Sequence, residues 1–361
     1  ESTLGTSKNQ NGRKETQQLT SNQTSLRFFG AQDADPRALD NERVCVLGYG
    51  NLGRAISLNL RDAGVPRLVV GNVADEYADQ AQTAGFTVLP IGEAVATSDI
   101  AFVLLPDEVI PEAFDAEIAP NLSAGSAIIF ASGYNLAYGL IAPPDTVDVL
   151  LLAPRMGGEL ARERYLEQSG FFAYVSVEND ASSRAWARLL GVAHAVGVLQ
   201  AGALELDARR EADLDLFIEQ TMGAVIGVAI MSAFSLGVEA GIPPEAMVLE
   251  MYMSGEMETV FRAFREMGFY RASDTHGPTA MYGGFMRTME LMQTDLASGF
   301  RKTLEEISSG QFAQQFQAER DAGYPSLSVA QLMASGESPT AQPIVQAEAR
   351  VRAMHENSRK E

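Results

Sequence analysis

The sequence predicts a doubly wound α/β domain in its first half and an all-α domain in its second half. From Val44 to about Val177, short apolar runs alternate with helical patterns, which is typical of a parallel sheet covered on both faces. From about Ser182 onward, long helical patterns follow one another, broken by Gly and Pro. The predicted domains span residues 27–205 and 206–356, after a polar segment, residues 1–26, that we expect to be a disordered tail.

The strands of the first half are continuous apolar runs bounded by turn residues. These runs occupy residues 44–48, 67–72, 86–90, 99–106, 126–132, 147–154 and 171–177. Helical patterns lie between them, for example through Leu60, over residues 78–84 and near residues 110–114. This alternation predicts parallel pairing of the strands.

The most informative motif follows the first strand, where residues 48–53 read GYGNLG. Gly48 permits a tight turn, Gly50 lets the backbone approach a pyrophosphate, and Gly53 allows a helix to pack closely on the strand. The phosphates would meet the positive end of the helix that begins near Leu52. Because strand and helix are both recognisable, the motif predicts dinucleotide binding rather than a ligand-free glycine turn. Cofactor contacts are expected from Gly48, Tyr49, Gly50, Asn51, Leu52 and Gly53.

The formal net charge of −20 disfavours nucleic acid and anionic membranes as partners.

Cys45 is the only cysteine, so an intrachain disulfide is impossible and a reducing compartment is indicated. Cys45 lies in the first predicted strand, where we expect a buried, inert thiol. We expect the protein in the cytoplasm, or in an organelle lumen if a targeting segment has been removed.

Residues 220–238 carry no formal charge over a length close to that of a membrane span. The segment is nevertheless rich in Gly, Ala and Ser and adjoins Glu219 and Glu239. We therefore expect a buried core helix rather than a membrane helix.

A pair of carboxylates precedes this segment. Asp215 and Glu219 are four residues apart, which places them about 6 Å from each other on one face of a helix. Magnesium suits such a pair, since it prefers carboxylates and water as ligands. The alternative is a solvated acidic face, which is common in so acidic a chain. Glu250, Glu256 and Glu258 on a later helix would complete a two-helix metal site, or form another acidic surface.

The choice of nicotinamide cofactor depends on the residues after the second strand. Asp75 and Glu76 stand at the position where a protein that binds the 2′-phosphate of NADPH would carry a basic residue. A carboxylate there accepts hydrogen bonds from the ribose hydroxyls and repels a phosphate, so NADH is favoured over NADPH. Alternatively, both acids simply start the next helix. Further cofactor contacts are expected at strand ends, where ligands bind in such sheets: Asn72, Asp75, Leu105, Pro106 and Asp107.

The chain resembles ketol-acid reductoisomerase in its shorter, class I form, over roughly residues 28 to 355. The resemblance is carried in order by these segments: GYGNLGRAISLNLRDAG at 48–64, LLPDEVIPE at 104–112, IAPNLSAG at 118–125, SGYNL at 132–136, IAPPDTVDVLLLAP at 141–154, EADLDLFIEQ at 211–220, PTAMYG at 278–283 and GQFAQQF at 310–316.

The resemblance implies a Rossmann domain, a knotted helical domain and at least a homodimer. It also implies a Mg²⁺-dependent reaction in which an alkyl group migrates within a 2-acetolactate-type substrate and NAD(P)H then delivers hydride. Divalent ions would polarise the carbonyl group and stabilise the alkoxide. Asp215 and Glu219 fall on the family's paired metal ligands, and Glu250 falls on a third carboxylate. Gly133 and Gly158 match the family's cofactor contacts.

The chain departs from the family at four site positions. Ser132 replaces a histidine, Arg155 a lysine, Ser254 a carboxylate and Gly277 a serine. Arg155 remains charged and cannot donate a proton, but it can bind a carboxylate bidentately. The chain holds about two extra residues between Glu250 and Gly277. A bulge there would bring Glu256 into the vacant carboxylate position, and without it the site supplies three carboxylates rather than four.

Three functions are consistent with these residues. The first is a reductoisomerase of branched-chain amino-acid synthesis, with Asp215, Glu219, Glu250, Ser132 and Arg155 in the catalytic site. The second is a paralogous reductase of a 2-oxo acid or imine that lacks the isomerase step. The third is a non-catalytic dinucleotide-binding subunit.

Overall fold

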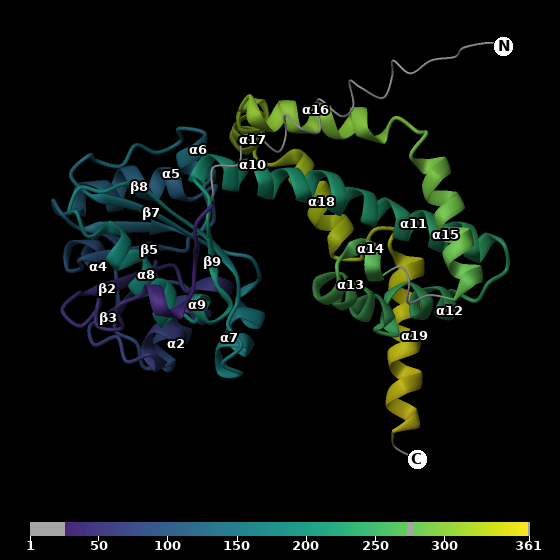
Figure 1. Ribbon diagram of the computed structural model, residues 1–361, viewed down its shortest axis with the longest axis horizontal. Coiled ribbons are helices and arrows are strands. Elements are labelled where there is room, and N and C mark those ends of the chain that lie inside the picture. The colour runs from purple at the N-terminus through teal and green to yellow at the C-terminus, as the bar shows by residue number, and fades with distance from the viewer. Residues whose placement is uncertain (1–25, 273–276, 360–361) are drawn as a thin grey trace, which may run out of the picture. The chain divides into compact units, whose positions relative to one another are not determined.

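The computed structural model describes residues 26–272 and 277–359. The chain divides into two compact units, Glu1–Ala212 and Asp213–Glu361 (Figure 1). Residues 1–25 of the expected disordered tail lie outside the described part.

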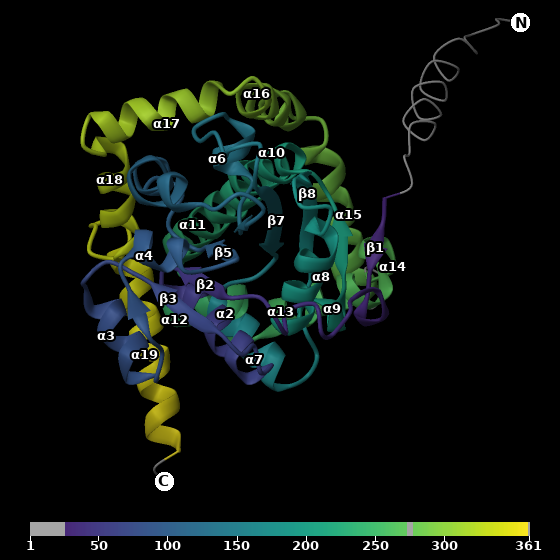
Figure 2. The ribbon, with the colours of Figure 1, turned by 90° about the vertical axis from the view of Figure 1, so that its left-hand side faces the viewer.

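The first unit is built on a nine-stranded sheet with the order β1-β9-β8-β7-β6-β5-β2-β3-β4. Strands β2, β3, β5, β7 and β8 are labelled in Figure 2. All seven predicted strands form, and the six from β4 to β7 in the sheet are parallel to one another. Strand β2 pairs with both β3 and β5. The strands that follow β2 in the chain therefore lie first on one side of it and then on the other. The strands are β1 (Phe28–Phe29), β2 (Val44–Leu47), β3 (Leu68–Gly71), β4 (Val88–Leu89), β5 (Ile100–Val103), β6 (Ala127–Phe130), β7 (Asp148–Pro154), β8 (Ala173–Asn179) and β9 (Ala203–Glu205).

The expectation of a purely parallel sheet is wrong at one side. Strand β8 runs antiparallel to β7, with Ala173 opposite Pro154, and β1 runs antiparallel to β9. The chain between β7 and β8 returns to the edge at which β7 ends, and this reverses the direction of β8. Strands β1 and β9 have only two and three residues, too few for a recognisable periodicity.

Helices cover both faces of this sheet, and the side chains of β2 show why. Val44 and Val46 point into one apolar cluster with Ile56 of helix α2, while Cys45 and Leu47 point into a second cluster on the opposite face. The helices of this unit are α2 (Asn51–Asp62), α3 (Glu76–Thr83), α4 (Ile91–Ala96), α5 (Ile110–Ala113), α6 (Tyr134–Ala137), α7 (Gly158–Leu166), α8 (Ala185–Ala195) and α9 (Val198–Ala201). Cys45 is fully buried, as predicted, and burial raises the pKa of its thiol to about 12.

The first described residues complete the sheet at its β9 edge. Arg27 forms an ion pair with Glu205 at 2.5 Å, and its guanidinium lies 4.3 Å from the ring centroid of Trp186. Phe28 packs where Gly202 has no side chain, since a Cβ there would lie 2.1 Å from the Phe28 ring. These contacts hold the strand against the sheet.

The second unit consists of helices. Helix α10 (Ala208–Ile218) begins in the first unit and continues as a π-helical turn, Glu219–Gly223, and then as α11 (Ala224–Glu239). The other elements are α12 (Pro244–Val248), a π-helical turn (Leu249–Met253), α13 (Glu256–Met267), α14 (Phe269–Ala272), α15 (Pro278–Leu291), α16 (Leu296–Ser308), α17 (Gln311–Asp321), α18 (Pro325–Ala334) and α19 (Gln342–Ser358). Its small core joins α11, α12 and α19 through Phe234, Val248, Ala347 and Val351.

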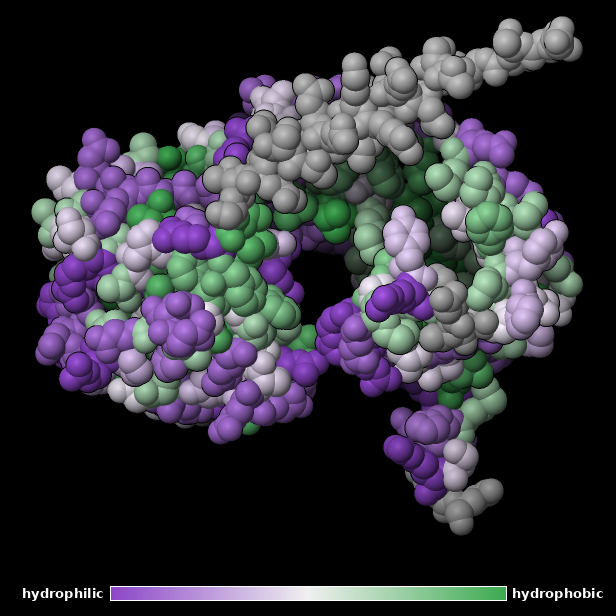
Figure 3. Space-filling model, in the orientation of Figure 1, coloured by the Kyte–Doolittle hydropathy of each residue, from purple (hydrophilic) through white to green (hydrophobic). Residues whose placement is uncertain are grey.

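Helix α11 is not the buried core helix that we expected. Phe234 is its only buried residue, and Val228 and Leu236 are 59% and 64% exposed. The continuous helix over residues 208–239 is long and apolar enough to cross a membrane by length and composition alone. Hydrophobic residues are accordingly visible on the surface of this unit (Figure 3). In the single chain, its neighbours in the helical unit leave most of α11 uncovered.

Candidate functional site

The glycine-rich turn has the geometry that its sequence predicts. Gly48 adopts a φ of +94°, which favours glycine. A Cβ on Gly53 would lie 2.0 Å from the carbonyl oxygen of Gly48, so helix and turn touch through backbone atoms. A Cβ on Gly50 would meet no atom within 4 Å. The turn is therefore tightly packed beneath Gly53 and open above Gly50, where a pyrophosphate would lie.

Two helices begin beside this turn without a side-chain cap. Helix α2 starts after Gly50 and α7 starts after Gly157, and neither glycine offers a capping group. A Cβ on Gly158 would lie 2.1 Å from the carbonyl oxygen of Asn51, so the two helix starts are in close contact. The first backbone amides of an α-helix have no partner within the helix and attract anions. A cavity of about 450 Å³ adjoins them and is lined by Tyr49, Gly50, Asn51, Arg54, Tyr77 and Gly158 among others.

Asn72 and Asp75 form one hydrogen-bonded unit after β3. The Asn72 side chain accepts a hydrogen bond from Tyr49 N at 3.0 Å and donates one to Asp75 Oδ1 at 2.8 Å. Asp75 Oδ1 also accepts from the amides of Tyr77 and Ala78, so it caps helix α3. The interpretation that Asp75 starts helix α3 is therefore confirmed. Its contact with the ribose stays a prediction. Asn72 and Asp75 also line a cavity of about 610 Å³ between α3 and β4.

The ends of β5 and β6 bring together Asp107 and Ser132. Ser132 Oγ donates to Asp107 Oδ2 at 3.2 Å and accepts from Tyr134 N at the same distance. Asn135 Nδ2 donates to Asp107 Oδ1 and to the Asp107 carbonyl, both at 3.1 Å. Leu105 and Pro106 precede Asp107 at this carboxyl edge, where the sequence predicts cofactor contacts.

Arg155 and Gly133 are joined by a residue that the sequence reasoning missed. Glu211 lies on α10 and its side chain is 2% exposed. Its Oε1 accepts from Arg155 Nη1 at 3.1 Å, and its Oε2 accepts from Gly133 N at 2.8 Å. A signal was present, because Glu211 stands four residues before Asp215 and therefore on the same helix face.

Two of the predicted metal carboxylates lie in π-helical turns. Asp215 is in α10, Glu219 opens one π-helical turn, and Glu250 lies in the other. Such turns are frequent at functional sites. Helix α13 begins at Glu256, after Gly255 with a φ of +80°, so the helix is interrupted where we predicted a bulge. Within the described ranges, no three His, Cys, Asp or Glu side chains gather closely enough to hold a metal ion.

The fold and the turn define a dinucleotide-binding α/β protein with a helical C-terminal unit. Family models for the "Acetohydroxy acid isomeroreductase, NADPH-binding domain" and the "Ketol-acid reductoisomerase, C-terminal domain" match residues 38–202 and 209–357. The chain belongs to the ketol-acid reductoisomerase family and is an NAD(P)-dependent oxidoreductase. This membership disfavours the non-catalytic subunit.

Individual relatives agree with the family models. A putative ketol-acid reductoisomerase 3 of Saccharolobus solfataricus is 37% identical over 298 residues, covering 81% of this chain and 89% of that protein. A ketol-acid reductoisomerase (NADP(+)) of Methanopyrus kandleri is 36% identical over 299 residues, covering 82% and 90%. The structure of an NADH-preferring ketol-acid reductoisomerase from an uncultured archaeon matches with a TM-score of 0.84 at 29% identity, covering 91% and 98%.

Proposed function

We propose that the protein converts a 2-acetolactate-type substrate by alkyl migration and reduction, with Mg²⁺ and NADH, in branched-chain amino-acid synthesis. The observation that carries this proposal is the match of both halves of the chain to the two domains of one enzyme family. The knotted topology of the helical domain is part of the same proposal, as is a location in the cytoplasm or an organelle lumen. The charge of −20 supports our expectation of no nucleic-acid or membrane partner.

The first unit would bind the cofactor through its glycine-rich turn. The backbone amides at the start of α2, near Asn51, would hold the pyrophosphate, and Gly50 leaves room for it. Leu105, Asp107 and Gly133 line the strand ends along which the nicotinamide half would extend. NADH is proposed over NADPH because Asp75, fixed by Asn72, presents a carboxylate near the expected ribose position and would repel a 2′-phosphate.

The carboxylates of the second unit fit magnesium by their chemistry. Asp215 and Glu219 stand one helical turn apart, and Mg²⁺ commonly takes one or two carboxylates and completes its shell with water. When bound, the metal would polarise the substrate carbonyl and stabilise the alkoxide. Glu250 and Glu256 are the proposed further carboxylates of this site.

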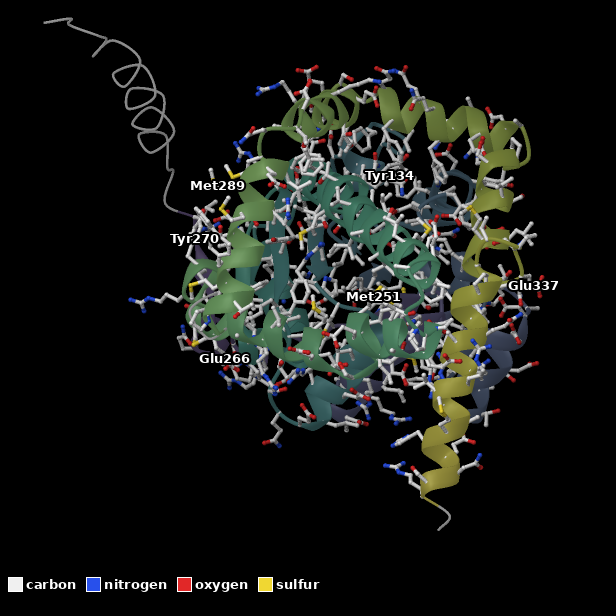
Figure 4. The ribbon with its side chains drawn as sticks, turned by 90° about the vertical axis from the view of Figure 1, so that its right-hand side faces the viewer. Tyr134, Met251, Glu266, Tyr270, Met289 and Glu337 are labelled. Carbon is white, nitrogen blue, oxygen red and sulfur yellow. The ribbon has the colours of Figure 1, made fainter. Side chains whose placement is uncertain are left out.

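The exposed helices of the second unit support a homodimer. Helix α11 leaves Val228 and Leu236 more than half exposed, and Tyr282 and Phe285 of α15 are 69% and 60% exposed. Figure 4 likewise shows Met289 of α15 on the outside of the ribbon. We propose that a second copy of the chain covers these exposed faces of α11 and α15, since apolar patches of this extent usually mark interfaces.

The decisive assay combines purified protein with 2-acetolactate, Mg²⁺ and either NADH or NADPH. Turnover that disappears on chelation and returns with Mg²⁺ is expected. The variant Asp215→Asn should lose this turnover and keep NADH binding, because the residue belongs to the metal site. Equal loss of activity and NADH binding would instead show a folding role for Asp215, and absence of turnover with both cofactors would refute the function.

A second candidate is a reductase without the isomerase step. It is favoured by Ser132, whose hydroxyl is already hydrogen-bonded to Asp107, and by Arg155, which cannot serve as a proton donor. The test compares 2-acetolactate with the pre-isomerised 3-hydroxy-2-oxo acid. Reduction of the oxo acid alone, independent of Mg²⁺, would establish the second candidate, whereas conversion of both with strict Mg²⁺ dependence would exclude it.

A further inference from the structure

The π-helical turn that carries Glu250 packs against the last helix of the chain. The turn, Leu249–Met253, continues directly from α12. Met251, Tyr252 and Met253 pack on the small core that α12 shares with α11 and α19, and Figure 1 shows α12 beside α19. Because π-helical turns are rare and occur mostly at functional sites, the contacts of this turn bear on the position of Glu250.

One hydrogen bond joins the turn to α19. The hydroxyl of Tyr252 donates to Oε1 of Glu348 at 2.7 Å, across 96 positions of the chain. The other carboxylate oxygen, Oε2, accepts from Nη2 of Arg352 at 3.1 Å, one turn further along α19. A hydrogen bond to an ionised carboxylate is stronger than one between neutral groups. Glu348 is only 21% exposed, so water competes little for its oxygens.

Tyr252 and Glu250 lie on different faces of the turn. Residues two positions apart in a helix do not face each other. Tyr252 is half-buried and packs toward the core shared with α19, whereas Glu250 is exposed. The turn is therefore held from one face, while the face that carries the Glu250 carboxylate is open to a ligand.

We propose that the hydrogen bond between Tyr252 and Glu348 fixes the π-helical turn and so orients Glu250 for Mg²⁺. Tyr252 and Glu348 are positioning residues in this scheme. A carboxylate on a turn that is already held loses less conformational freedom when the metal binds. The inference rests on the proposed function, which assigns Glu250 to Mg²⁺. It adds that the last helix of the chain sets part of the metal affinity.

The test measures the binding of Mg²⁺ to the full chain by calorimetry, without substrate or cofactor. Tyr252→Phe keeps the ring and its packing and removes the hydroxyl donor. Its Kd for Mg²⁺ should rise about tenfold, a usual effect of losing a contact behind a metal ligand. Glu348→Leu cannot accept the hydrogen bond and should behave in the same way. Glu348→Gln still offers an amide oxygen to Tyr252 and should keep most of the affinity.

Arg350→Gln is the matched control. Arg350 of α19 forms an ion pair with Glu245 of α12, so this variant also removes a polar contact between α19 and the segment that leads into the turn. It leaves Tyr252 and Glu348 in place and should bind Mg²⁺ as the parent does. Thermal melts without metal report the loss of stability in each variant. If Mg²⁺ affinity followed melting temperature across all variants, Arg350→Gln included, a general structural role would replace the positioning role.

Turnover is measured separately from metal binding. For Tyr252→Phe, the Mg²⁺ concentration that gives half the maximal rate should rise, with kcat at saturating Mg²⁺ changed far less. Failure of the parent to convert 2-acetolactate refutes the proposed function, while weakened Mg²⁺ binding by Tyr252→Phe alone still supports the positioning role. Unchanged Mg²⁺ affinity in Tyr252→Phe, or no Mg²⁺ binding by the parent, overturns it.

Discussion

Asn72 Nδ2 donates a hydrogen bond to Asp75 Oδ1 at 2.8 Å, and Asn72 Oδ1 accepts one from Tyr49 N at 3.0 Å. A single side chain thus connects the glycine-rich turn to the residue expected to read the ribose. Asp75 in turn caps α3 by accepting from the amides of Tyr77 and Ala78.

The first prediction concerns cofactor choice. Asp75→Ser keeps a side-chain oxygen for the cap of α3 but removes the negative charge. The NADPH-to-NADH ratio of kcat/KM should therefore rise about tenfold or more, because the repulsion of the 2′-phosphate is lost. Glu93→Gln, at an exposed position in α4, is the control for general charge. An unchanged ratio in Asp75→Ser would mean that Asp75 only caps the helix.

The second prediction separates ligand binding from folding within the glycine-rich turn. Gly50→Ala should fold normally, since its Cβ enters open space, and should bind NADH much more weakly because that space is where the pyrophosphate would lie. Gly53→Ala should lower the unfolding free energy by about 1–3 kcal/mol, because its Cβ would collide with the Gly48 carbonyl. Thermal melts without cofactor and NADH titrations distinguish the two. A Gly50→Ala protein with normal NADH affinity would place the phosphates elsewhere.

The third prediction uses two neighbouring glycines at the start of α7. Gly158→Ala places a Cβ 2.1 Å from the Asn51 carbonyl and should destabilise the protein by about 1–3 kcal/mol. Gly157→Ala meets no atom within 4 Å and should stay within about 0.5 kcal/mol of the parent. Denaturant unfolding measures both. Equal effects would show that the α2–α7 contact contributes nothing to stability.

The fourth prediction is a pH dependence that arises from Cys45. Burial raises the pKa of this thiol to about 12 in the folded protein, whereas it is about 8.5 in the unfolded chain. The folded state then holds a proton that the unfolded state releases, so stability falls as pH rises between these values. Relative to Cys45→Ala, the unfolding free energy should decline by about 1.4 kcal/mol per pH unit above about pH 8.5. Parallel pH profiles of the two proteins would contradict this burial effect.

The fifth prediction addresses the homodimer. Val228→Glu puts a charge in the exposed apolar face of α11 and should shift the protein toward a 38.8 kDa monomer. Leu166→Glu, at a 62% exposed position in the first unit, is the matched control. Sedimentation velocity gives both masses. A Val228→Glu protein that stays dimeric, or a parent that is already monomeric, would show that α11 is covered in another way.

Much of the first unit could be read from the sequence, because the physics there is local. Four-residue apolar runs such as Val44–Leu47 are fully buried, and the turn needs glycine for the positive φ of Gly48 and the close packing of Gly53. The reversed β8 was not predictable in this way, because an antiparallel neighbour and a parallel one bury the same residues.

Long-range pairing explains the remaining omissions. Glu211 looked like one more acid in an acidic helix, and its role depends on Gly133 and Arg155, which are 78 and 56 positions away. The exposure of α11 was misjudged because the hydrophobicity of a helix does not show which elements, if any, pack against it.

Trp186 is the only tryptophan of the chain, and it lies beneath Arg27 and 5.1 Å from the ring of Phe29. Its emission is therefore an intrinsic reporter of whether the first described strand is attached to the sheet. If the N-terminus is shortened stepwise, a change in Trp186 emission would mark the residue whose loss detaches β1. The edge of β9 would then be exposed and able to pair with another strand. Expression tags are best placed before Leu26 for the same reason, since the attachment begins at Arg27.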